Sequence, residues 1–489
     1  MAHFHIVYFD VDTGFYPSFH HGLAYIIGTL KEQGHHVTLD HLATLEDIPQ
    51  GIARLDAIRP QIMGLSFTTN QFQYVRTFLS HEQRHKPLIV AGGVHCTLVK
   101  ERLFQELPSI DALCIGEGEL PMRDLGRAMD NGTDYTTTAS MIFKTEKGFI
   151  TNPVAPLPQL DDLALPDYTL FKYEQIIRDG GESFPMLLGR GCPYKCSYCC
   201  NHVLRDSYPN KKDYVRFPSI PRSIEIIQSN LKLYPNTRQI LFADDTFTLN
   251  KKWIIPFCAE YKKVIPLPYI CNARVETITE PVVESLKDSG CASIEFGIES
   301  GSEWLRKNLL NRHHSNDKIR QAFAIVRKHG IKTFAFNIVG IPFETNAMAQ
   351  ETFRFNQELR ADYGRCFFFF PYPGSEIYEV AKKFDLLPDN LELVSGYTES
   401  PITKPMHQSH SDIRKNNERL NILFMVRSIG SKFGLHPILE TVLVHSAIVF
   451  RKPIFLLLDP KSSNAWIRKT RWLIRTLFQR YLRGSNAKP

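Results

Sequence analysis

Three cysteines lie close together in the stretch GRGCPYKCSYCCNH, residues 189–202. Cys192, Cys196 and Cys199 follow one another at short intervals, within a run of Gly, Pro, Lys and Tyr. A loop can wrap three such thiolates around one inorganic group, which a straight strand cannot do. Cysteine thiolates are the usual ligands of iron–sulfur clusters. Because three ligands leave one iron of a 4Fe–4S cluster open, the spacing predicts a cluster that binds a further molecule.

Two other uses of these cysteines stay open from the residues alone. A structural zinc site takes four Cys or His ligands, and Cys200 and His202 are candidates for the fourth. A disulfide framework is typical of secreted, cysteine-rich chains. Ten cysteines among 489 residues is ordinary usage, so disulfides are the weaker alternative. The compact triad favours the cluster over zinc.

The pattern C-x-x-x-C-x-x-C, with the aromatic Tyr198 directly before its last cysteine, resembles the signature of the radical S-adenosylmethionine (AdoMet) enzymes. The resemblance implies that the open iron binds the amino and carboxylate groups of AdoMet. One electron from the cluster then cleaves a C–S bond and gives a 5′-deoxyadenosyl radical. It also implies an external electron donor, such as a flavodoxin or a ferredoxin.

The length and composition indicate a multidomain globular protein. At 489 residues, 43% of them hydrophobic, the chain is long enough for two to four domains with sizeable cores. The N-terminus MAHFHIVYFDVD has no basic region followed by a long apolar stretch, so no signal peptide is expected. No uninterrupted apolar run is long enough to predict a membrane-spanning helix. We therefore expect a cytoplasmic location.

Residues 1–150 alternate short apolar runs with helical patterns. The helical pattern is clear in GLAYIIGTLKEQG, and the predicted strands are HFHIVYFDVD, HHVTLDHL, QIMGLSFTT, PLIVAGGVHCT and ALCIGEGE. Strands that alternate with helices predict a doubly wound parallel sheet. Ligands of such sheets lie beyond the carboxyl ends of the strands. The sequence has mostly small residues there, in Ser66–Thr69, Gly92–His95 and Gly116–Glu119.

This first segment resembles the cobalamin-binding domain that precedes many radical AdoMet enzymes. The resemblance covers roughly residues 5–130 and is strongest at AGGVHCT and IGEGE. It implies cobalamin as a second cofactor. The candidate cobalamin-binding residues are Ser66, Thr68, Gly92, Gly93, Val94, Gly116, Glu117, Gly118 and Glu119.

One part of the cobalamin pattern is missing. The family motif D-x-H-x-x-G, whose histidine coordinates cobalt, does not occur here. His20, His21 and His41 are candidate substitutes, although a surface or turn histidine is the simpler interpretation. A domain that keeps the fold without the cofactor is the alternative.

The segment 151–182 is a predicted linker, and residues 183–385 restart the alternation with longer units. The linker is rich in Pro and acidic residues and has weak periodicity, so we expect it to run extended along the surface.

Six predicted strands follow in residues 183–385, in PMLLGRGC, RQILFADDTFT, PYICNARVETI, CASIEFGIESGS, KTFAFNIVGIPFET and GRCFFFFPYPGSEIY. Six such units predict a partial (β/α)6 barrel, whose chemistry belongs at the C-terminal strand ends.

Polar residues stand at those strand ends, and the resemblance assigns several of them to AdoMet. Glu299, in FGIES, matches a carboxylate that accepts the ribose hydroxyls, and Arg274 is a candidate for the AdoMet carboxylate or a substrate acid. Asp244 and Asp245 stand where the family contacts the methionine amine, although the common G-G-E form is absent. The candidate AdoMet-binding residues are Tyr198, Asp244, Asp245, Arg274, Glu299 and Ser300. A buried charge pair or a loop cap is the alternative for each.

The run FFFFPY, residues 367–372, is apolar on both faces, as a buried parallel strand should be. Core packing is the favoured interpretation of these rings. The alternative is that some of them line a pocket for an apolar substrate.

Residues 386–489 form a predicted helical region that ends in a basic amphipathic tail. Residues 459–489 contain eight basic residues and one acidic residue, so the tail accounts for the whole net charge of +7. A basic helix with Trp466 and Trp472 suits the surface of an anionic bilayer. A helix docked on the protein with a solvated basic face is an equal alternative. No nucleic-acid recognition motif accompanies the charge, so no nucleic-acid partner is expected.

The leading hypothesis is a cobalamin-dependent radical AdoMet enzyme, namely a C-methyltransferase that acts on an unactivated carbon. The resemblance implies that one AdoMet supplies the methyl group through cobalamin, and that a second is cleaved at the cluster. The alternative enzyme is a radical AdoMet cyclase, oxidoreductase or rearrangement enzyme with the same domains and no methyl transfer. A third hypothesis is a degenerate metal-binding or membrane-docking protein. The expected substrate is a small molecule, with a weak preference for an apolar or lipid-like one.

Overall fold

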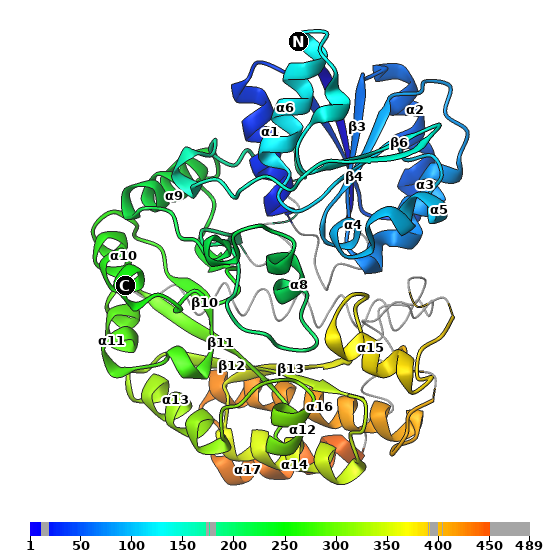
Figure 1. Ribbon diagram of the computed structural model, residues 1–489. Helices are drawn as coiled ribbons and strands as arrows, with labels where there is room; N and C mark the ends of the chain where they lie inside the picture. Colours follow the sequence, from blue (N-terminus) through cyan, green and yellow to red (C-terminus); the bar gives the residue numbers. More distant parts are fainter. Residues whose placement is uncertain are drawn as a thin grey trace.

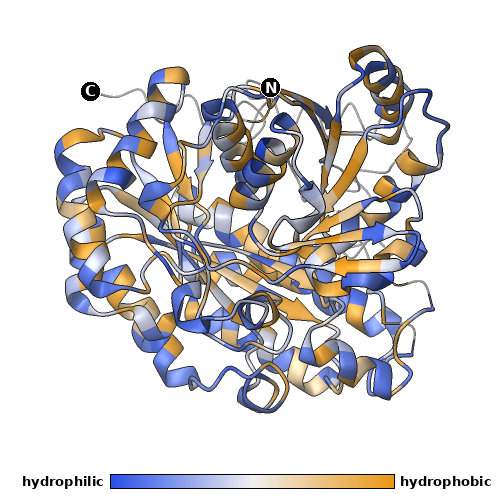
Figure 2. Ribbon diagram, turned by 45° about the horizontal axis from the view of Figure 1, so that its top comes forward, coloured by the Kyte–Doolittle hydropathy of each residue, from blue (hydrophilic) through white to orange (hydrophobic). Residues whose placement is uncertain are grey.

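The computed structural model describes residues 1–10, 19–172, 176, 182–389, 391, 400–402 and 404–449. Within these ranges the strands form two sheets, and the first lies above the open side of the second in Figure 1. The strands are largely hydrophobic, whereas the helices carry both hydrophobic and hydrophilic residues (Figure 2). Each sheet is therefore buried by the apolar sides of its helices.

The first sheet has the strand order β2-β1-β3-β4-β5-β6-β7. Its strands are β1 (His3–Phe9), β2 (His36–Leu42), β3 (Ile62–Ser66), β4 (Leu88–Gly92), β5 (Ala112–Cys114), β6 (Met141–Thr145) and β7 (Gly148–Thr151). The five strands from β2 to β5 pair in parallel, which confirms the predicted doubly wound sheet. Strands β6 and β7 add an antiparallel hairpin that the sequence analysis did not predict. A turn this short permits only antiparallel pairing, because a parallel crossover needs a long connection.

Helices cover both faces of the first sheet. They are α1 (His21–Glu32), α2 (Ile48–Ile58), α3 (Phe72–Ser80), α4 (Val94–Val99), α5 (Leu103–Glu106) and α6 (Glu119–Asp130). Alternate residues of β1 point to opposite faces. Phe4 and Ile6 join a core with α1 and α6, whereas Val7 and Phe9 join a second core with α2 and α3.

The second sheet has six parallel strands in the order β13-β12-β11-β10-β9-β8. They are β8 (Ser183–Met186), β9 (Gln239–Phe242), β10 (Tyr269–Ala273), β11 (Cys291–Glu299), β12 (Lys332–Val339) and β13 (Tyr363–Phe368). The helices that alternate with them are α8 (Asn201–Asp206), α9 (Ile220–Leu233), α10 (Lys251–Val264), α11 (Glu280–Asp288), α12 (Glu303–Asn308), α13 (Asn316–Lys328), α14 (Asn346–Leu359) and α15 (Glu376–Lys383). In Figure 1 this sheet curls inside an outer ring of helices from α9 to α14. The predicted (β/α)6 partial barrel is confirmed.

Two further helices, α16 (His410–Phe433) and α17 (Pro437–Val449), follow the barrel. Helix α16 packs on β13, the last strand of the curled sheet, and α17 packs on α16. The C-terminal region is therefore helical as far as it is described. The predicted basic tail, residues 459–489, lies outside the described residues. No helix in the described part of the chain has the length and apolar character needed to cross a membrane.

The segment before β8 is more buried than the expected surface linker. Tyr168 and Phe171 are buried in the core that also contains Phe19 and Phe184. The rings of Phe19 and Phe184 stack with centroids 5.4 Å apart, and the ring of Tyr168 meets Phe184 edge-on at 5.4 Å. The apolar core thus runs without interruption from the first sheet to the barrel. The aromatic residues of the linker explain the difference, because such large side chains contribute most when buried.

Candidate active site

The three cysteines lie in the loop that follows β8, inside the mouth of the barrel. Cys192 and Cys196 are buried and Cys199 is half-buried, and all three are free thiols. The backbone N–H of Ser197 donates to Leu310 at 3.3 Å, and the Asn311 amide donates to the carbonyl of Lys195 at 2.7 Å. The loop is therefore fixed against the segment that follows α12.

Positive and amide donors surround the cysteine sulfurs. The guanidinium of Arg274 donates to Cys196 Sγ at 3.2 Å, and that of Arg312 lies 4.0 Å from the same sulfur. The Asn201 amide donates to Cys199 Sγ at 3.6 Å. Donors of this kind stabilise the negative charge that the sulfurs of an iron–sulfur cluster carry. In the described part of the chain, no three His, Cys, Asp or Glu side chains converge as ligands of a single metal ion. The donor set suits a cluster, whose irons spread the ligands more widely than one ion does.

Glu299 faces the cysteine loop from the end of β11. The hydroxyl of Tyr198 donates to Glu299 Oε1 at 2.9 Å, and Arg312 Nη1 lies 3.4 Å from the same oxygen. Glu299 has a φ of 65°, and the pairing of β11 with β12 shifts register between Gly297 and Glu299. A positive φ is uncommon at a residue other than glycine and costs backbone strain. In this conformation the carboxylate contacts Tyr198 of the cysteine loop.

A cavity of about 240 Å³ opens beside Glu299 and Tyr198. Its other lining residues are Asn70, Ile338, Phe367, Phe368, Phe369, Phe370 and Tyr372. The four phenylalanines therefore line a pocket, where the sequence analysis favoured core packing. Phe369 and Phe370 are buried but Phe367 and Phe368 are only half-buried, because β13 is the last strand of the sheet. Asn70 comes from the first sheet domain, so this cavity has walls from both domains.

The two aspartates at the end of β9 support the cysteine loop from below. The Asp244 carboxylate accepts the backbone N–H groups of Leu188 at 3.3 Å and of Gly189 at 2.5 Å. Burial raises the pKa of Asp244 to about 7, although these two hydrogen bonds lower it. Asp245 accepts from the Asn201 amide at 3.1 Å, and burial raises its pKa. Both carboxylates are thus engaged by the loop that carries the cysteines.

The remaining two candidate AdoMet residues differ in their surroundings. Arg274 reaches Cys196 and also donates to Glu276 at 2.6 Å, and its guanidinium lies 3.7 Å above the ring of Tyr194. Ser300 is fully buried, and its hydroxyl lies 3.1 Å from that of Thr352 on α14. The structure therefore brings Arg274 to the cysteine loop, whereas Ser300 packs behind Glu299 against a helix.

A second cavity, of about 250 Å³, lies at the carboxyl ends of strands β3, β4 and β5. All the candidate cobalamin-binding residues line it except Thr68, whose backbone N–H donates to the side chain of Gln71 at 2.8 Å. At Gly93, where φ is 93°, a Cβ atom would lie 2.8 Å from the carbonyl oxygen of Phe67. The rest of the wall is mostly apolar and comes from α1, α6, the core strands and residues of the barrel such as Leu187, Leu204 and Tyr214. A concave apolar site with a few polar groups is typical of cofactor pockets, so the residues fit a flat cofactor.

Only one of the three candidate histidines lines this cavity. His20 lies at its edge and its ring nitrogen is 2.9 Å from the Ser66 hydroxyl. Burial lowers the pKa of His20 to about 4, so the ring is neutral at pH 7. His21 bonds to the Tyr168 hydroxyl at 2.9 Å, and His41 pairs with Asp10 at 2.9 Å.

The cavity of the first sheet is closed by residues of the barrel. Arg190, inside the cysteine motif, forms ion pairs with Glu117 at 2.7 Å and with Glu119 at 2.6 Å. Arg216 also pairs with Glu117, and the Tyr208 hydroxyl accepts the Glu117 backbone N–H at 2.7 Å. The candidate cobalamin residues Glu117 and Glu119 therefore hold their carboxylates on barrel arginines.

The sequence analysis missed these barrel residues and also missed Arg312. The only signal in the sequence for these contacts was the charged Arg190 in the cysteine motif, residues 189–202, where it has no role as a cluster ligand. Nothing in the sequence paired it with residues more than seventy positions away.

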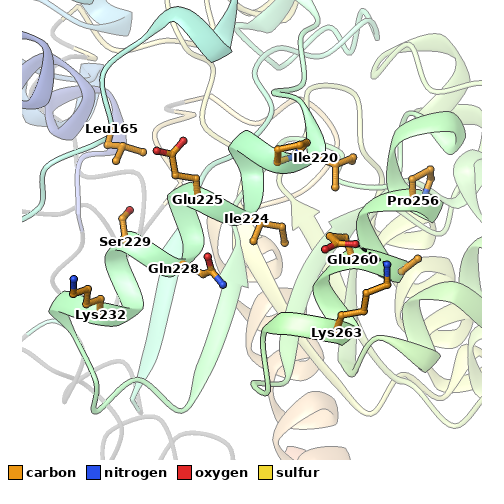
Figure 3. Close-up of a pocket in the computed structure, with 12 residues that line it drawn as sticks. Leu165, Ile220, Ile224, Glu225, Gln228, Ser229, Lys232, Pro256, Glu260 and Lys263 are labelled. Atoms are coloured by element: carbon orange, nitrogen blue, oxygen red, sulfur yellow. Dashed lines mark hydrogen bonds and ion pairs between the residues drawn. The ribbon is translucent and has the colours of Figure 1, made fainter.

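A larger cavity than those of the barrel mouth and the first sheet is a groove of about 880 Å³ on the outside of the barrel, between α9 and α10. Figure 3 shows Ile224 and Glu225 on one wall, Glu260 and Lys263 on the other, and Leu165 of the linker at one end. None of the candidate site residues lines it. Its size therefore does not mark it as the active site.

Comparisons with known proteins match both halves of the chain. The profile of the radical SAM superfamily matches residues 186–355, and that of the B12 binding domain matches residues 13–126. An uncharacterised methyltransferase of Pyrococcus horikoshii is 31% identical over 422 residues, which cover 83% of this chain and 87% of that protein. The anaerobic magnesium-protoporphyrin IX monomethyl ester cyclase of Rubrivivax gelatinosus is 25% identical over 372 residues, 73% of this chain and 65% of the cyclase.

Two solved structures share the fold. The radical AdoMet methyltransferase TsrM of Kitasatospora setae, with cobalamin and a [4Fe–4S] cluster bound, has a TM-score of 0.65 at 16% identity and covers 78% of each chain. The cobalamin-dependent radical enzyme OxsB, with aqua-cobalamin bound, has a TM-score of 0.66 at 17% identity. The OxsB match covers 98% of this chain and 75% of that one. Both halves of the fold and their order are therefore common to all three proteins.

Proposed function

This chain belongs to the radical AdoMet enzymes that carry a cobalamin-binding domain, and we propose that it is a C-methyltransferase. The observation that carries the proposal is the 31% identity, over both domains, to a protein named as a methyltransferase. The fold shared with the methyltransferase TsrM supports it. The site adds that the cavity of the first sheet and the cavity at the barrel mouth both have walls from the two domains.

Three cofactors serve an enzyme of this family: a 4Fe–4S cluster, AdoMet and cobalamin. When bound, the cluster supplies the electron that cleaves AdoMet, and cobalamin supplies the carrier of the methyl group. We propose that Cys192, Cys196 and Cys199 hold the cluster. Arg274 and Arg312 then stabilise the negative charge of the cluster, because their guanidinium groups lie beside Cys196.

We propose that the cavity beside Glu299 takes the adenosine part of AdoMet. Its phenylalanine and tyrosine rings suit a flat heteroaromatic base, which prefers to stack on or meet such rings edge-on. The Glu299 carboxylate accepts hydrogen bonds, and the two ribose hydroxyls are donors that match it. Tyr198 and Arg312 orient that carboxylate at 2.9 and 3.4 Å.

The cavity of the first sheet is the proposed cobalamin site. Gly92, Gly93, Gly116 and Gly118 bring the backbone close to the cavity, and Ser66 and His20 provide a neutral polar edge. Barrel residues Arg190 and Tyr208 close the same cavity. The barrel therefore completes the wall of a site that lies mainly in the first domain, which helps to keep water from it.

Labelled AdoMet tests the methyltransferase proposal. Anaerobically reconstituted protein would be incubated with dithionite, hydroxocobalamin, trideuteromethyl-AdoMet and a small-molecule extract, and the products analysed by mass spectrometry. A methyltransferase gives a small molecule that gains the CD3 group, together with S-adenosylhomocysteine and 5′-deoxyadenosine. Formation of 5′-deoxyadenosine without any CD3 transfer to a small molecule would reject methyl transfer. Absence of 5′-deoxyadenosine under all conditions would contradict radical chemistry.

A radical AdoMet cyclase is the second candidate function. The 25% identity to the Rubrivivax gelatinosus cyclase, over 73% of this chain, favours it. We take such a cyclase to close a ring by removing hydrogen from the substrate, with AdoMet as the oxidant and no methyl transfer. The same labelled incubation separates the two candidates, because the cyclase gives 5′-deoxyadenosine and an unlabelled product of lower hydrogen content.

A further inference from the structure

Asn201, the first residue of α8, joins three groups around the cysteine loop. Its amide nitrogen donates to Cys199 Sγ at 3.6 Å and to Asp245 Oδ1 at 3.1 Å. Its amide oxygen accepts the hydroxyl of Tyr214 at 2.8 Å. One side chain therefore connects a cysteine of the loop, a buried carboxylate and a tyrosine.

The chemistry of the partners fixes the orientation of this amide. A carboxylate accepts hydrogen bonds and cannot donate when ionised, and a thiolate likewise accepts, so both must face the NH2 group. The reversed amide would direct its oxygen at Asp245 and Cys199 and lose both bonds. The Tyr214 hydroxyl is then the only one of the three partners that can donate to the amide oxygen.

Tyr214 connects this network to the other cofactor cavity. Its side chain is buried and lines the cavity of the first sheet domain. Its ring lies 6.1 Å from that of Tyr208, which closes the same cavity against Gly116 and Glu117. The tyrosine thus has its ring at one site and its hydroxyl on a residue that contacts the other site.

We propose that Tyr214 and Asn201 are positioning residues that couple occupancy of the cobalamin cavity to the reduction potential of the cluster. This inference rests on the proposed function, because it takes Cys199 as a cluster ligand. A hydrogen bond to a ligating sulfur offsets the charge added on reduction and raises the reduction potential. The Tyr214 hydroxyl polarises the Asn201 amide and so strengthens that bond. A cofactor packed on the Tyr214 ring holds the hydroxyl on the amide.

The coupling has a functional consequence. The cluster is easier to reduce when the cavity is filled, so AdoMet is cleaved mainly in protein that has its second cofactor. Linkage is reciprocal for equilibrium constants, so reduction of the cluster also strengthens binding in the cavity.

The test measures the cluster potential with the cavity empty and filled. Full-length protein, reconstituted anaerobically, would be titrated with reductant with and without saturating hydroxocobalamin, and the reduced cluster followed by EPR. The wild type is expected to shift to a higher potential when hydroxocobalamin is bound. Tyr214→Phe should lose this shift. Asn201→Ala, which does not line the cavity, should lower the potential in both states and also lose the shift.

Tyr208→Phe is the matched control, because Tyr208 lines the same cavity but its hydroxyl accepts from Glu117. It should keep a wild-type shift when hydroxocobalamin is bound. Retention of the full shift in both Tyr214→Phe and Asn201→Ala would overturn the coupling, as would a wild type that binds both cofactors and shows no shift. A wild type that assembles no cluster would instead reject the proposed function, and the coupling with it.

Discussion

Arg312 is the single side chain that joins most of the groups around the cysteine loop. Its guanidinium donates to the Tyr198 hydroxyl at 3.0 Å and to the Gly297 carbonyl at 2.5 Å, and it contacts Glu299 and Cys196. It lies in the segment after α12, outside any motif in the sequence. At the residue scale, the predicted residues Tyr198, Glu299 and Cys196 all contact this arginine, which was not predicted.

The ligand assignment predicts different outcomes for neighbouring cysteines. Cys196→Ala should abolish cluster binding, because two ligands cannot hold the cluster as three do. Cys200→Ala should retain a full cluster, because Cys200 is proposed to lie outside the ligand set. Absorbance of the reconstituted protein in the sulfur-to-iron charge-transfer region measures both. A full cluster in Cys196→Ala would reject the assignment.

Gly297 is predicted to be necessary for the position of Glu299. A Cβ atom at residue 297 would collide with Glu299 Oε1, so Gly297→Ala should displace the carboxylate. A lost hydrogen bond to a charged group costs about 2 kcal/mol, so AdoMet affinity should fall by roughly tenfold or more. Equilibrium dialysis of AdoMet with the reconstituted protein measures the change.

Glu299→Gln is the comparison for that substitution, since it keeps the shape and removes the charge. We expect Gly297→Ala to weaken binding at least as much as Glu299→Gln does. Wild-type affinity in both variants would exclude Glu299 from the AdoMet site.

The buried Glu344 should make the stability of the protein depend on pH, whether or not cofactors are bound. It is buried, accepts the Gly340 N–H at 2.7 Å and the Gln408 amide at 2.9 Å, and its second oxygen has no hydrogen-bond partner. Burial raises its pKa from 4.5 to about 7. Between these values the folded chain keeps a proton that the unfolded chain loses, so the free energy of unfolding falls as the pH rises.

The size of that effect follows from the shift. A change in the pKa of Glu344 from 4.5 to about 7 corresponds to roughly 3 kcal/mol of unfolding free energy. The wild type loses this contribution as the pH rises to 7. Glu344→Gln should remove this dependence. The wild type should lose unfolding free energy between pH 5 and pH 8, whereas the variant should not lose this part of it. Denaturant unfolding at the two pH values measures the difference, and identical pH profiles would show that Glu344 is ionised in the folded state.

At the scale of elements, the sequence predicted the parallel strands of both sheets, but not the β6–β7 hairpin or the helix that covers the edge at β13. Strand β13 ends the curled sheet, and an uncovered edge strand invites pairing with another chain. Helix α16 covers it with asparagines: Asn421 accepts from the Cys366 N–H at 3.0 Å, and Asn417 donates to the Cys366 carbonyl at 2.9 Å. The sequence does not predict that these asparagines cover a strand edge, because asparagines are also common on helix faces that are exposed to solvent.

Removal of one of these asparagines should destabilise the barrel. Asn421→Ala leaves the Cys366 N–H without its partner in a part-buried position, which costs about 1–3 kcal/mol of unfolding free energy. The control is Asn308→Ala, since the Asn308 amide makes an exposed bond to its own helix at Trp304. Denaturant unfolding should separate the two variants, and equal stabilities would show that the edge is held by apolar packing alone.

At the scale of the whole molecule, the two domains are joined by an apolar core and by charged pairs. The core passes through Tyr168, Phe171 and Phe184, and the charged pairs link Arg190 to Glu117 and Glu119. The arginine follows directly from the strand that leads to the cysteines. The first sheet domain is therefore tied to the start of the cysteine loop.

Loss of Arg190 should cost far more stability than loss of an exposed arginine. Arg190→Ala leaves the Glu119 carboxylate, which is 3% exposed, without its partner, whereas Glu117 keeps its pair with Arg216. Breaking such a buried pair costs about 3 kcal/mol. The control is Arg320→Ala, whose pair with Glu358 is 42% and 53% exposed and contributes under about 1 kcal/mol. Chemical denaturation followed by circular dichroism compares them. Equal losses of unfolding free energy in the two variants would show that the ion pairs of Arg190 do not hold the domains together.

The sequence alone determined the parallel strands of the two sheets, the order of the sheets along the chain and the chemical types of residue at the site. Periodicity and turn residues act locally, so the strands that end in Ser66, Gly92 and Glu299 could be predicted without the tertiary structure. The cysteine spacing likewise predicted the cluster, and the family comparisons confirmed the cofactors. These features depend on residues that are neighbours in the chain.

The tertiary structure decided which distant residues meet. It alone pairs Glu117 and Glu119 with Arg190, brings Arg312 to Glu299, and uses the aromatic run of β13 to line a pocket. It also links Tyr214 through Asn201 to Cys199. Such contacts depend on how two cores pack and where a strand ends the sheet, and no local pattern in the sequence encodes that geometry.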